Sequence, residues 1–256
     1  MYDPNIQAIG FIPARYSSTR LPGKPLIEIH GKPLLQWVWE AACQSTTLRR
    51  IVVATDDERI AEFCFMIGAE FVMTPPELPS GTDRVRYAYK EINEESQIIL
   101  NLQGDEPLIT GKIIDKLITQ FAKSGSDVGT LVRKIKSFDE LVNPSIVKVV
   151  MNNNRSAIYF SRHEIPYIRD ISKEEWLKHH DFWKHIGVYV YRHDILDKFG
   201  KLDKSELENL EKLEQLRLLQ EGCTIHCVEI DKDLIGVDTP ADVDIVKEKL
   251  TRIHSL

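Results

Sequence analysis

Long apolar runs are missing from this sequence. No stretch approaches the ~18 apolar residues of a membrane-spanning helix, so we expect no membrane contact. The first residues, MYDPNIQ, have neither the basic nor the apolar region of a signal peptide. Four cysteines in 256 residues do not imply a disulfide framework. These absences predict a cytoplasmic protein.

A basic excess is missing as well. The chain has 39 acidic and 33 basic residues, a net charge of −6, which argues against a nucleic-acid partner. The common glycine-rich phosphate loops are also absent. Ser18 stands where a Walker loop needs its first glycine, Pro25 follows Lys24, and no GxGxxG is present. Ordinary kinases and dinucleotide enzymes are therefore disfavoured.

What the sequence does contain is a regular alternation of strand-like and helix-like segments, which predicts an α/β fold with a mostly parallel sheet and helices on both faces. After residue 143 the rhythm changes, and a polar, aromatic stretch at 164–183 interrupts the strands. This 164–183 stretch suits a lid or a subunit contact. We expect one domain over residues 1–256, in which about 144–200 carry the insertion. The expected strands are 6–12, 51–54, 71–72, 98–102, 128–132, 146–151, 157–161, 184–192 and 224–230, and the expected helices are 34–45, 57–68, 81–89, 112–123, 205–221 and 239–253.

The loop after the first strand, in FIPARYSSTRLPGKPL, carries the cations Arg15, Arg20 and Lys24. Ligands of open α/β sheets bind at the carboxyl ends of the strands, so these charges suit a polyphosphate. Three cations alone are more often just solvated. The prolines of the loop favour binding, because they stiffen a segment that would otherwise lose entropy when a ligand is bound.

Two carboxylates are candidates for a Mg²⁺ site. Asp105 follows an apolar strand in NLQGDEP, where it either binds metal or only caps a turn. Asp238 precedes the last helix in GVDTPADV. Because proline prefers the first helical position, we expect Thr239 to cap that helix with Asp242 as its capping-box partner. Asp238 is then free to join Asp105.

A strand and a helix supply candidates for a second binding surface. In HIGVYVYR, His185, Gly187, Tyr189 and Tyr191 share one face, and the other face is apolar. Such a strand suits a hydroxyl-rich ligand, although a lone His or Tyr is usually structural. Glu214 lies within a leucine stripe of the 205–221 helix, where its partner is either an internal arginine or a sugar hydroxyl.

These motifs, together with VATDDERI, SGTDR, AIYFSRHEIP and LEKLEQLR, resemble the 3-deoxy-manno-octulosonate (KDO) cytidylyltransferase family, also called CMP-KDO synthetases, from about residue 9 to 246. The resemblance implies a Rossmann-like, three-layer nucleotide-diphospho-sugar transferase fold. It also implies transfer of CMP from CTP to KDO, with release of pyrophosphate, for lipopolysaccharide biosynthesis. It further implies Mg²⁺ dependence and a homodimer.

The resemblance also assigns residues. Arg15 and Lys24 would bind the triphosphate, and Asp105 and Asp238 would hold Mg²⁺. The remaining nucleotide contacts would come from Ala14, Ser80, Gly81, Thr82, Arg84 and Gln103, and the sugar contacts from Arg162, His185, Tyr189, Glu214 and Gln215. One departure is Leu78, where the family often has histidine. An Arg162–Glu214 scaffold pair remains an equal alternative to sugar binding by Arg162.

Two other functions stay open on the sequence. The acceptor is either KDO or a related acidic sugar such as 8-amino-KDO or sialic acid. The sequence does not separate close analogues of KDO, because a single side chain could recognise the change from a hydroxyl to an amine. A catalytically silent nucleotide-binding regulator is less favoured, since it would be expected to have lost Asp105, Asp238 or Lys24, and all three are present.

Overall fold

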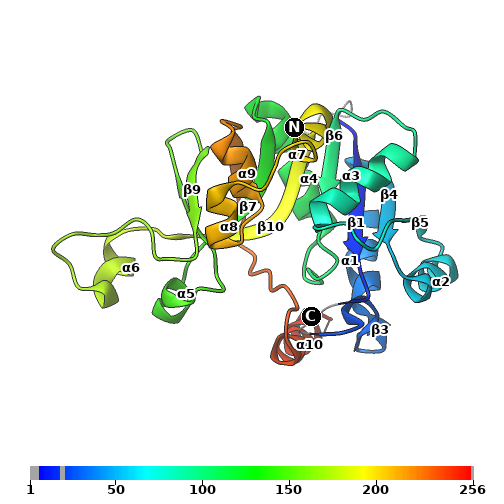
Figure 1. The fold of residues 1–256 in the computed structure, drawn as a ribbon. Helices are drawn as coiled ribbons and strands as arrows, with labels where there is room; N and C mark the ends of the chain where they lie inside the picture. Colours follow the sequence, from blue (N-terminus) through cyan, green and yellow to red (C-terminus); the bar gives the residue numbers. More distant parts are fainter. Residues whose placement is uncertain (1–5, 18–20, 255–256) are drawn as a thin grey trace.

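A central sheet forms the middle layer of the computed structural model, which describes residues 6–17 and 21–254 (Figure 1). Its strands are β1 (Ala8–Ala14), β4 (Leu48–Thr55), β5 (Glu70–Met73), β6 (Ile98–Asn101), β7 (Val128–Lys134), β8 (Lys148–Met151), β9 (Ala157–Ser161), β10 (Trp183–Arg192) and β11 (Ile225–Glu229). The order across the sheet is β11-β7-β10-β6-β1-β4-β5, and β8 and β9 extend it from β10. A separate hairpin consists of β2 (Glu28–Ile29) and β3 (Lys32–Pro33).

The sheet confirms the predicted α/β class and is mostly parallel, although β9 and β10 run against the other strands. The pairs β1–β4, β1–β6, β4–β5 and β7–β11 are parallel. β10 is antiparallel to its neighbours β6, β7 and β8. β10 therefore lies in the middle of the sheet, antiparallel to both β6 and β7, and its side chains lie next to those of β6, about 90 residues earlier in the sequence.

Helices cover both faces of this sheet. The helices of the described residues are α1 (Leu34–Cys43), α2 (Glu58–Ile67), α3 (Gly81–Glu91), α4 (Gly111–Ser124), α5 (Phe138–Val142), α6 (Trp176–His179), α7 (His193–Phe199), α8 (Glu206–Glu211), α9 (Gln215–Gln220) and α10 (Pro240–His254), with 3-10 turns η1 (Lys24–Leu26) and η2 (Lys173–Glu175). Among residues 6–17 and 21–254, none of these helices is long and apolar enough to cross a membrane.

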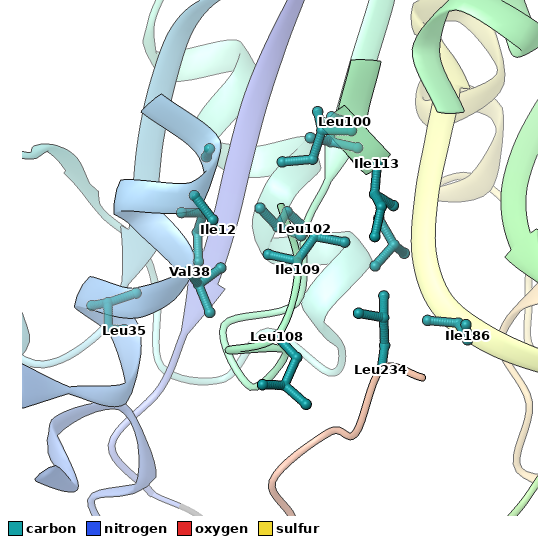
Figure 2. Packing of buried hydrophobic residues seen from close by; sticks show 14 of the residues in the cluster. Ile12, Leu35, Val38, Leu100, Leu102, Leu108, Ile109, Ile113, Ile186 and Leu234 are labelled. Carbon is teal, nitrogen blue, oxygen red and sulfur yellow. The ribbon is translucent and has the colours of Figure 1, made fainter. Parts of the chain in front are cut away.

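One face of the sheet packs against α1 and α4. In α4 the apolar residues recur every three or four positions, so Ile113, Leu117 and Phe121 all turn toward the strands and are buried. Figure 2 shows this core close up, with Ile12 of β1 and Leu100 of β6 among side chains from α1, α4, β10 and the loop before α10. The opposite face packs against α3, α7 and α9. The molecule is thus a three-layer arrangement.

The alternation predicted for β10 is confirmed. Ile186, Val188 and Val190 lie in the α1–α4 core, whereas Tyr189 and Tyr191 lie in the core on the other face. The pairing with β7 is irregular between Ile186 and Tyr189.

The segment between β9 and β10 is a long arm that stands away from the sheet in Figure 1. A small core of its own holds it, in which Trp176 and Phe182 stack with ring centroids 5.8 Å apart against Ile135 and Leu141. β10 also falls within the expected insertion at 144–200, yet it belongs to the main sheet.

The prediction of one helix over 205–221 is wrong. The segment forms two short helices, α8 and α9, because Lys212 adopts a left-handed backbone conformation with φ 55°. Leu210, which the helical stripe would have buried, is 72% exposed. The break frees the following residues from the helix and lets Glu214 turn toward the end of the sheet, where α3 begins.

Candidate active site

A cavity of about 380 Å³ lies where the loops after β1 and β6 meet the start of α3. It is lined by Pro13, Ala14, Arg15, Ser17, Lys24, Pro25, Leu78, Pro79, Ser80, Gly81, Arg84, Gln103, Gly104, Asp105, Glu214 and Asp238. The lining includes every predicted nucleotide residue except Thr82, which lies buried behind it, and both predicted metal ligands. Leu78 is part of the wall, and Arg20 lies outside the described residues.

Lys24 reaches the cavity through a tight turn. Gly23 just before it has φ +69°, a conformation that favours glycine, and its amide donates to the carbonyl of Tyr16 at 2.9 Å. A Cβ at this position would also lie 3.1 Å from the Tyr16 ring. The guanidinium of Arg59, on α2, covers the same ring at 3.3 Å. The glycine in LPGKP is therefore required by the backbone.

Asp105 and Asp238 converge on Lys24. The Lys24 Nζ atom donates to Asp105 Oδ2 at 2.6 Å and to Asp238 Oδ1 at 3.1 Å. Burial alone would lower the pKa of Lys24, but the two carboxylates outweigh it and raise that pKa above its usual value. The ammonium group therefore stays charged, and three residues far apart in the sequence form one charged cluster.

The capping arrangement that leaves Asp238 available is confirmed. The Thr239 amide donates to Asp242 Oδ2 at 2.8 Å, and the Asp242 amide donates to Thr239 Oγ1 at 3.4 Å, the reciprocal pattern of a capping box. The Val237 amide donates to the carbonyl of Asp105 at 2.9 Å and ties the two acidic loops together. Asp238 thus faces the cavity because its neighbours do the capping.

Glu106, beside this cluster, is a residue that sequence reasoning did not single out. Its side chain is buried, and its Oε1 lies 3.2 Å from where a Cβ on Gly236 would be. Burial, with a further contribution from Asp105, raises the pKa of Glu106 to about 8. Glu106 is therefore largely protonated at neutral pH. Only its place after the metal candidate in GDEP could have signalled it.

The start of α3 gives the cavity a wall suited to anions. Ser80 caps the helix by accepting from the Asp83 amide at 3.1 Å, which leaves other first-turn amides pointing outward. Arg84, one turn on, is nearly inaccessible and pairs with Asp56 at 2.9 Å. The wall therefore combines a helix N-terminus with a guanidinium held in place.

Of the five predicted sugar residues, Glu214 alone lines this cavity. Its carboxylate accepts from the hydroxyl of Thr82 at 2.8 Å, and burial raises its pKa. This hydroxyl takes the place of the internal arginine that was one of the two predicted partners, and contact with a sugar hydroxyl stays a prediction. Arg217, the nearby arginine, instead pairs with Glu208 at 2.6 Å.

The other four sugar candidates do not line the cavity. Tyr189 and Gln215 are buried, and the tyrosine hydroxyl donates to Gln215 Oε1 at 3.0 Å. His185 Nε2 is 3.0 Å from the hydroxyl of Thr130. Arg162 donates through Nε to the Glu211 carbonyl at 2.7 Å and through Nη1 to the Pro144 carbonyl at 3.1 Å. The predicted Arg162–Glu214 scaffold pair is therefore wrong, because backbone carbonyls hold this arginine.

His185 should make the stability of the protein depend on pH. Burial, with the nearby charge of Lys184, lowers its pKa to about 3, whereas an unfolded chain has about 6.5. Between these values the unfolded chain binds a proton that the folded protein does not, so the free energy of unfolding falls as pH falls. The contribution is complete above pH ~6.5 and is lost toward pH ~3.

The measurement is urea unfolding from pH 7 to pH 4.5. His185→Gln, which keeps a polar group near Thr130, should flatten the acid-side loss by up to about 1.4 kcal/mol per pH unit relative to the unsubstituted protein. His179→Gln, at an exposed position, is the matched control. Parallel curves for the unsubstituted protein and His185→Gln would contradict the buried, neutral imidazole.

Comparisons with known proteins point in the same direction as this geometry. A family model described as cytidylyltransferase matches residues 9–230. A 3-deoxy-manno-octulosonate cytidylyltransferase of Cytophaga hutchinsonii is 44% identical over 240 residues, covering 93% of this chain and 96% of the relative. That of Parabacteroides distasonis is 45% identical over 240 residues, covering 92% and 95%.

Among solved structures, a CMP:2-keto-3-deoxy-manno-octonic acid synthetase complexed with CTP superposes with a TM-score of 0.89. It is 40% identical, and the match covers 96% of this chain and 99% of that one. The likeness therefore extends over nearly the whole chain.

Proposed function

The chain belongs to the cytidylyltransferase family, and we propose that it transfers CMP from CTP to KDO, giving CMP-KDO and pyrophosphate. The relatives at 44% and 45% identity have the name of this enzyme, and the match covers nearly their full length. The similar solved structure is described as a complex with CTP. The product is the activated sugar for lipopolysaccharide biosynthesis.

The observation that carries this proposal is the convergence of Lys24, Asp105 and Asp238 in one cavity. A triphosphate needs cations at its phosphates, and Lys24 and Arg15 supply them from the first loop. The N-terminus of α3 adds a helix dipole that favours negative charge. These groups lie together in the described part of the chain and suit a nucleoside triphosphate.

The reaction is an in-line displacement. The anomeric hydroxyl of KDO attacks the α-phosphorus of CTP, the bond to the β-phosphate breaks, and pyrophosphate leaves with that electron pair. No covalent enzyme intermediate is required. Arg15 and Lys24 would stabilise the negative charge that develops on the phosphate oxygens, because fixed charges at such a site need no reorganisation during the reaction.

We propose Mg²⁺ as the cofactor, held by Asp105 and Asp238. The donor chemistry fits, since Mg²⁺ prefers carboxylate oxygens and keeps sites for water and phosphate. Among residues 6–17 and 21–254, no group of three or more His, Cys, Asp or Glu is placed to hold a metal. Mg²⁺ would neutralise phosphate charge, while Lys24 would exchange its carboxylate partners for phosphate oxygens.

For the sugar, we propose that Arg162, His185, Tyr189, Glu214 and Gln215 form the binding pocket. Glu214 lies in the cavity wall, and Tyr189 and Gln215 form a buried hydrogen-bonded pair. These positions support a sugar pocket on the Glu214 side of the cavity. The Gln215 Nε2 atom is buried with no hydrogen-bond partner among the described residues. A hydroxyl-rich ligand would satisfy such a donor.

Arg162→Lys tests the sugar pocket. Lysine keeps the charge but lacks the planar fork that binds both oxygens of a carboxylate, so we expect the KM for KDO to rise roughly tenfold, with little change in the KM for CTP. Initial-rate kinetics with each substrate varied measure both constants. Arg169→Lys, on the same arm with its side chain 87% exposed, is the control. Lower thermal stability with unchanged KDO kinetics would instead make Arg162 a scaffold residue.

The proposed reaction itself is tested by pyrophosphate release with four nucleoside triphosphates and several acidic sugars. CTP with KDO should be the preferred pair. Preference for 8-amino-KDO or sialic acid would move the acceptor to a related acidic sugar. No release with any sugar, despite nucleotide binding, would favour the non-catalytic regulator.

We also propose that the enzyme works in the cytoplasm as a homodimer. The cytoplasm is where CTP is available. The arm before β10 supports the dimer, because Tyr167 is 75% exposed on it and Ile158 of β9 is 59% exposed. Sedimentation measurements would decide the oligomeric state.

A further inference from the structure

Asn101 is a polar residue in the centre of the sheet. It is the last residue of β6, is completely buried, and pairs with Phe11 of β1 and Tyr189 of β10. Burying an amide there is costly unless both of its ends are hydrogen-bonded. They are, because Nδ2 donates to Thr82 Oγ1 at 3.3 Å and Oδ1 accepts from Gln103 Nε2 at 2.9 Å.

Glu214, at the end of this chain of hydrogen bonds away from Gln103, determines which atom donates in each bond. The Thr82 hydroxyl donates a hydrogen bond to the carboxylate of Glu214 at 2.8 Å. A hydroxyl has one hydrogen, so Thr82 Oγ1 can only accept in its other hydrogen bonds. Its lone pairs accept from the Asn101 amide. The amide nitrogen of Asn101 must therefore face Thr82, and its oxygen must face Gln103. We call Glu214, Thr82, Asn101 and Gln103 the relay.

The near end of the relay lies in the cavity wall. Because Nε2 of Gln103 donates one of its two protons to Asn101, the orientation of this amide is fixed, and Oε1 is the acceptor that it offers to a ligand. That oxygen lies 3.5 Å from where a Cβ on Gly81 would stand, at the start of α3. The same amide turned round would present a donor, so its orientation decides which ligand group it can bind.

We propose that Asn101 is a positioning residue that fixes Gln103 as a hydrogen-bond acceptor for a donor on the bound nucleotide. This inference rests on the proposed function and extends it to specificity. The donor is either the exocyclic amine of cytosine or the 2′-hydroxyl of the ribose. An amine is replaced by a carbonyl in uracil, which would face the Gln103 oxygen without a proton between them.

Binding of CTP, UTP and dCTP, measured by calorimetry with Mg²⁺ present and KDO absent, tests the relay. Asn101→Leu removes both amide bonds, and Thr82→Val removes the hydroxyl at nearly the same shape. Thr82→Ser retains the hydroxyl and is the matched control. We expect each of the first two to weaken CTP binding and to reduce one selectivity ratio by roughly two- to tenfold, and Thr82→Ser to keep both ratios.

The ratio that changes identifies the donor. A smaller preference for CTP over UTP assigns the cytosine amine, and a smaller preference for CTP over dCTP assigns the ribose 2′-hydroxyl. If Asn101→Leu does not fold, the Thr82→Val and Thr82→Ser pair still decides. Lower melting temperatures with both ratios unchanged would make Asn101 a packing residue and overturn the inference.

The same titration separates this inference from the proposed function. An unsubstituted protein that binds none of the three nucleotides contradicts the proposed function and the relay together. An unsubstituted protein that prefers CTP, with variants that keep that preference, contradicts the relay alone.

Discussion

Asp105→Asn is expected to reduce turnover by roughly 100-fold or more while leaving the melting temperature nearly unchanged. The substitution removes one of the two carboxylates that converge on Lys24 and keeps the shape of the side chain. An amide is a much weaker ligand for Mg²⁺ than a carboxylate. Stability should change little, because the side chain is 27% exposed and Lys24 keeps its contact with Asp238.

The measurement is pyrophosphate release at saturating CTP and KDO, together with a thermal melt. Asp244→Asn, on α10 with its side chain 82% exposed, controls for loss of an acidic charge. Near-native turnover in Asp105→Asn would show that the metal assignment is wrong. A titration of Mg²⁺ against CTP binding would then show whether any protein carboxylate contributes.

Lys24→Ala is expected to cost about 2–4 kcal/mol of transition-state stabilisation. Its ammonium group is the cation between two carboxylates in the cavity wall, so its removal also takes away the positive charge that it gives to Asp105 and Asp238. CTP binding, the chemical step, or both should therefore weaken. The same direction is expected for Arg15→Ala, whose side chain also lines the cavity.

CTP titration and single-turnover rates would divide the loss between binding and chemistry. Lys32→Ala is a suitable control, because Lys32 also pairs with a carboxylate, Glu40 at 2.6 Å, but is not among the residues that line the cavity. An unchanged CTP titration together with an unchanged rate in Lys24→Ala would contradict its role at the triphosphate.

Most of the helices and strands could be predicted because their signals are local. Period-two and period-3.6 apolar patterns, together with caps such as Asp57 and Gly68 around α2, depend only on near neighbours. The segment at 205–221 failed for the opposite reason. The helical spacing of its leucines continues on both sides of Lys212, but Lys212 has a left-handed backbone conformation that ends the helix. Nothing in the local pattern of apolar residues predicts that conformation.

The candidate site divides in the same way. Lys24, Asp105 and Asp238 could be chosen from their loops because each follows a strand-like segment or is relieved of capping. The direction of β10 and its position beside β6 were not predicted, and that position places Tyr189 next to Asn101. Asn101 was visible as the single polar residue of an apolar strand, but its partner Thr82 lies on a helix in another layer.

The sequence alone therefore determined the fold class, the cationic first loop and the two acidic loops, since residue type, turn chemistry and periodicity act over a few positions. The tertiary structure decided what those residues meet. It brought Asp105 and Asp238 to one ammonium group, gave Arg162 backbone carbonyls instead of Glu214, and joined Glu214 to Gln103 through a buried relay. Such contacts depend on which strands become neighbours, and packing of the whole chain settles that.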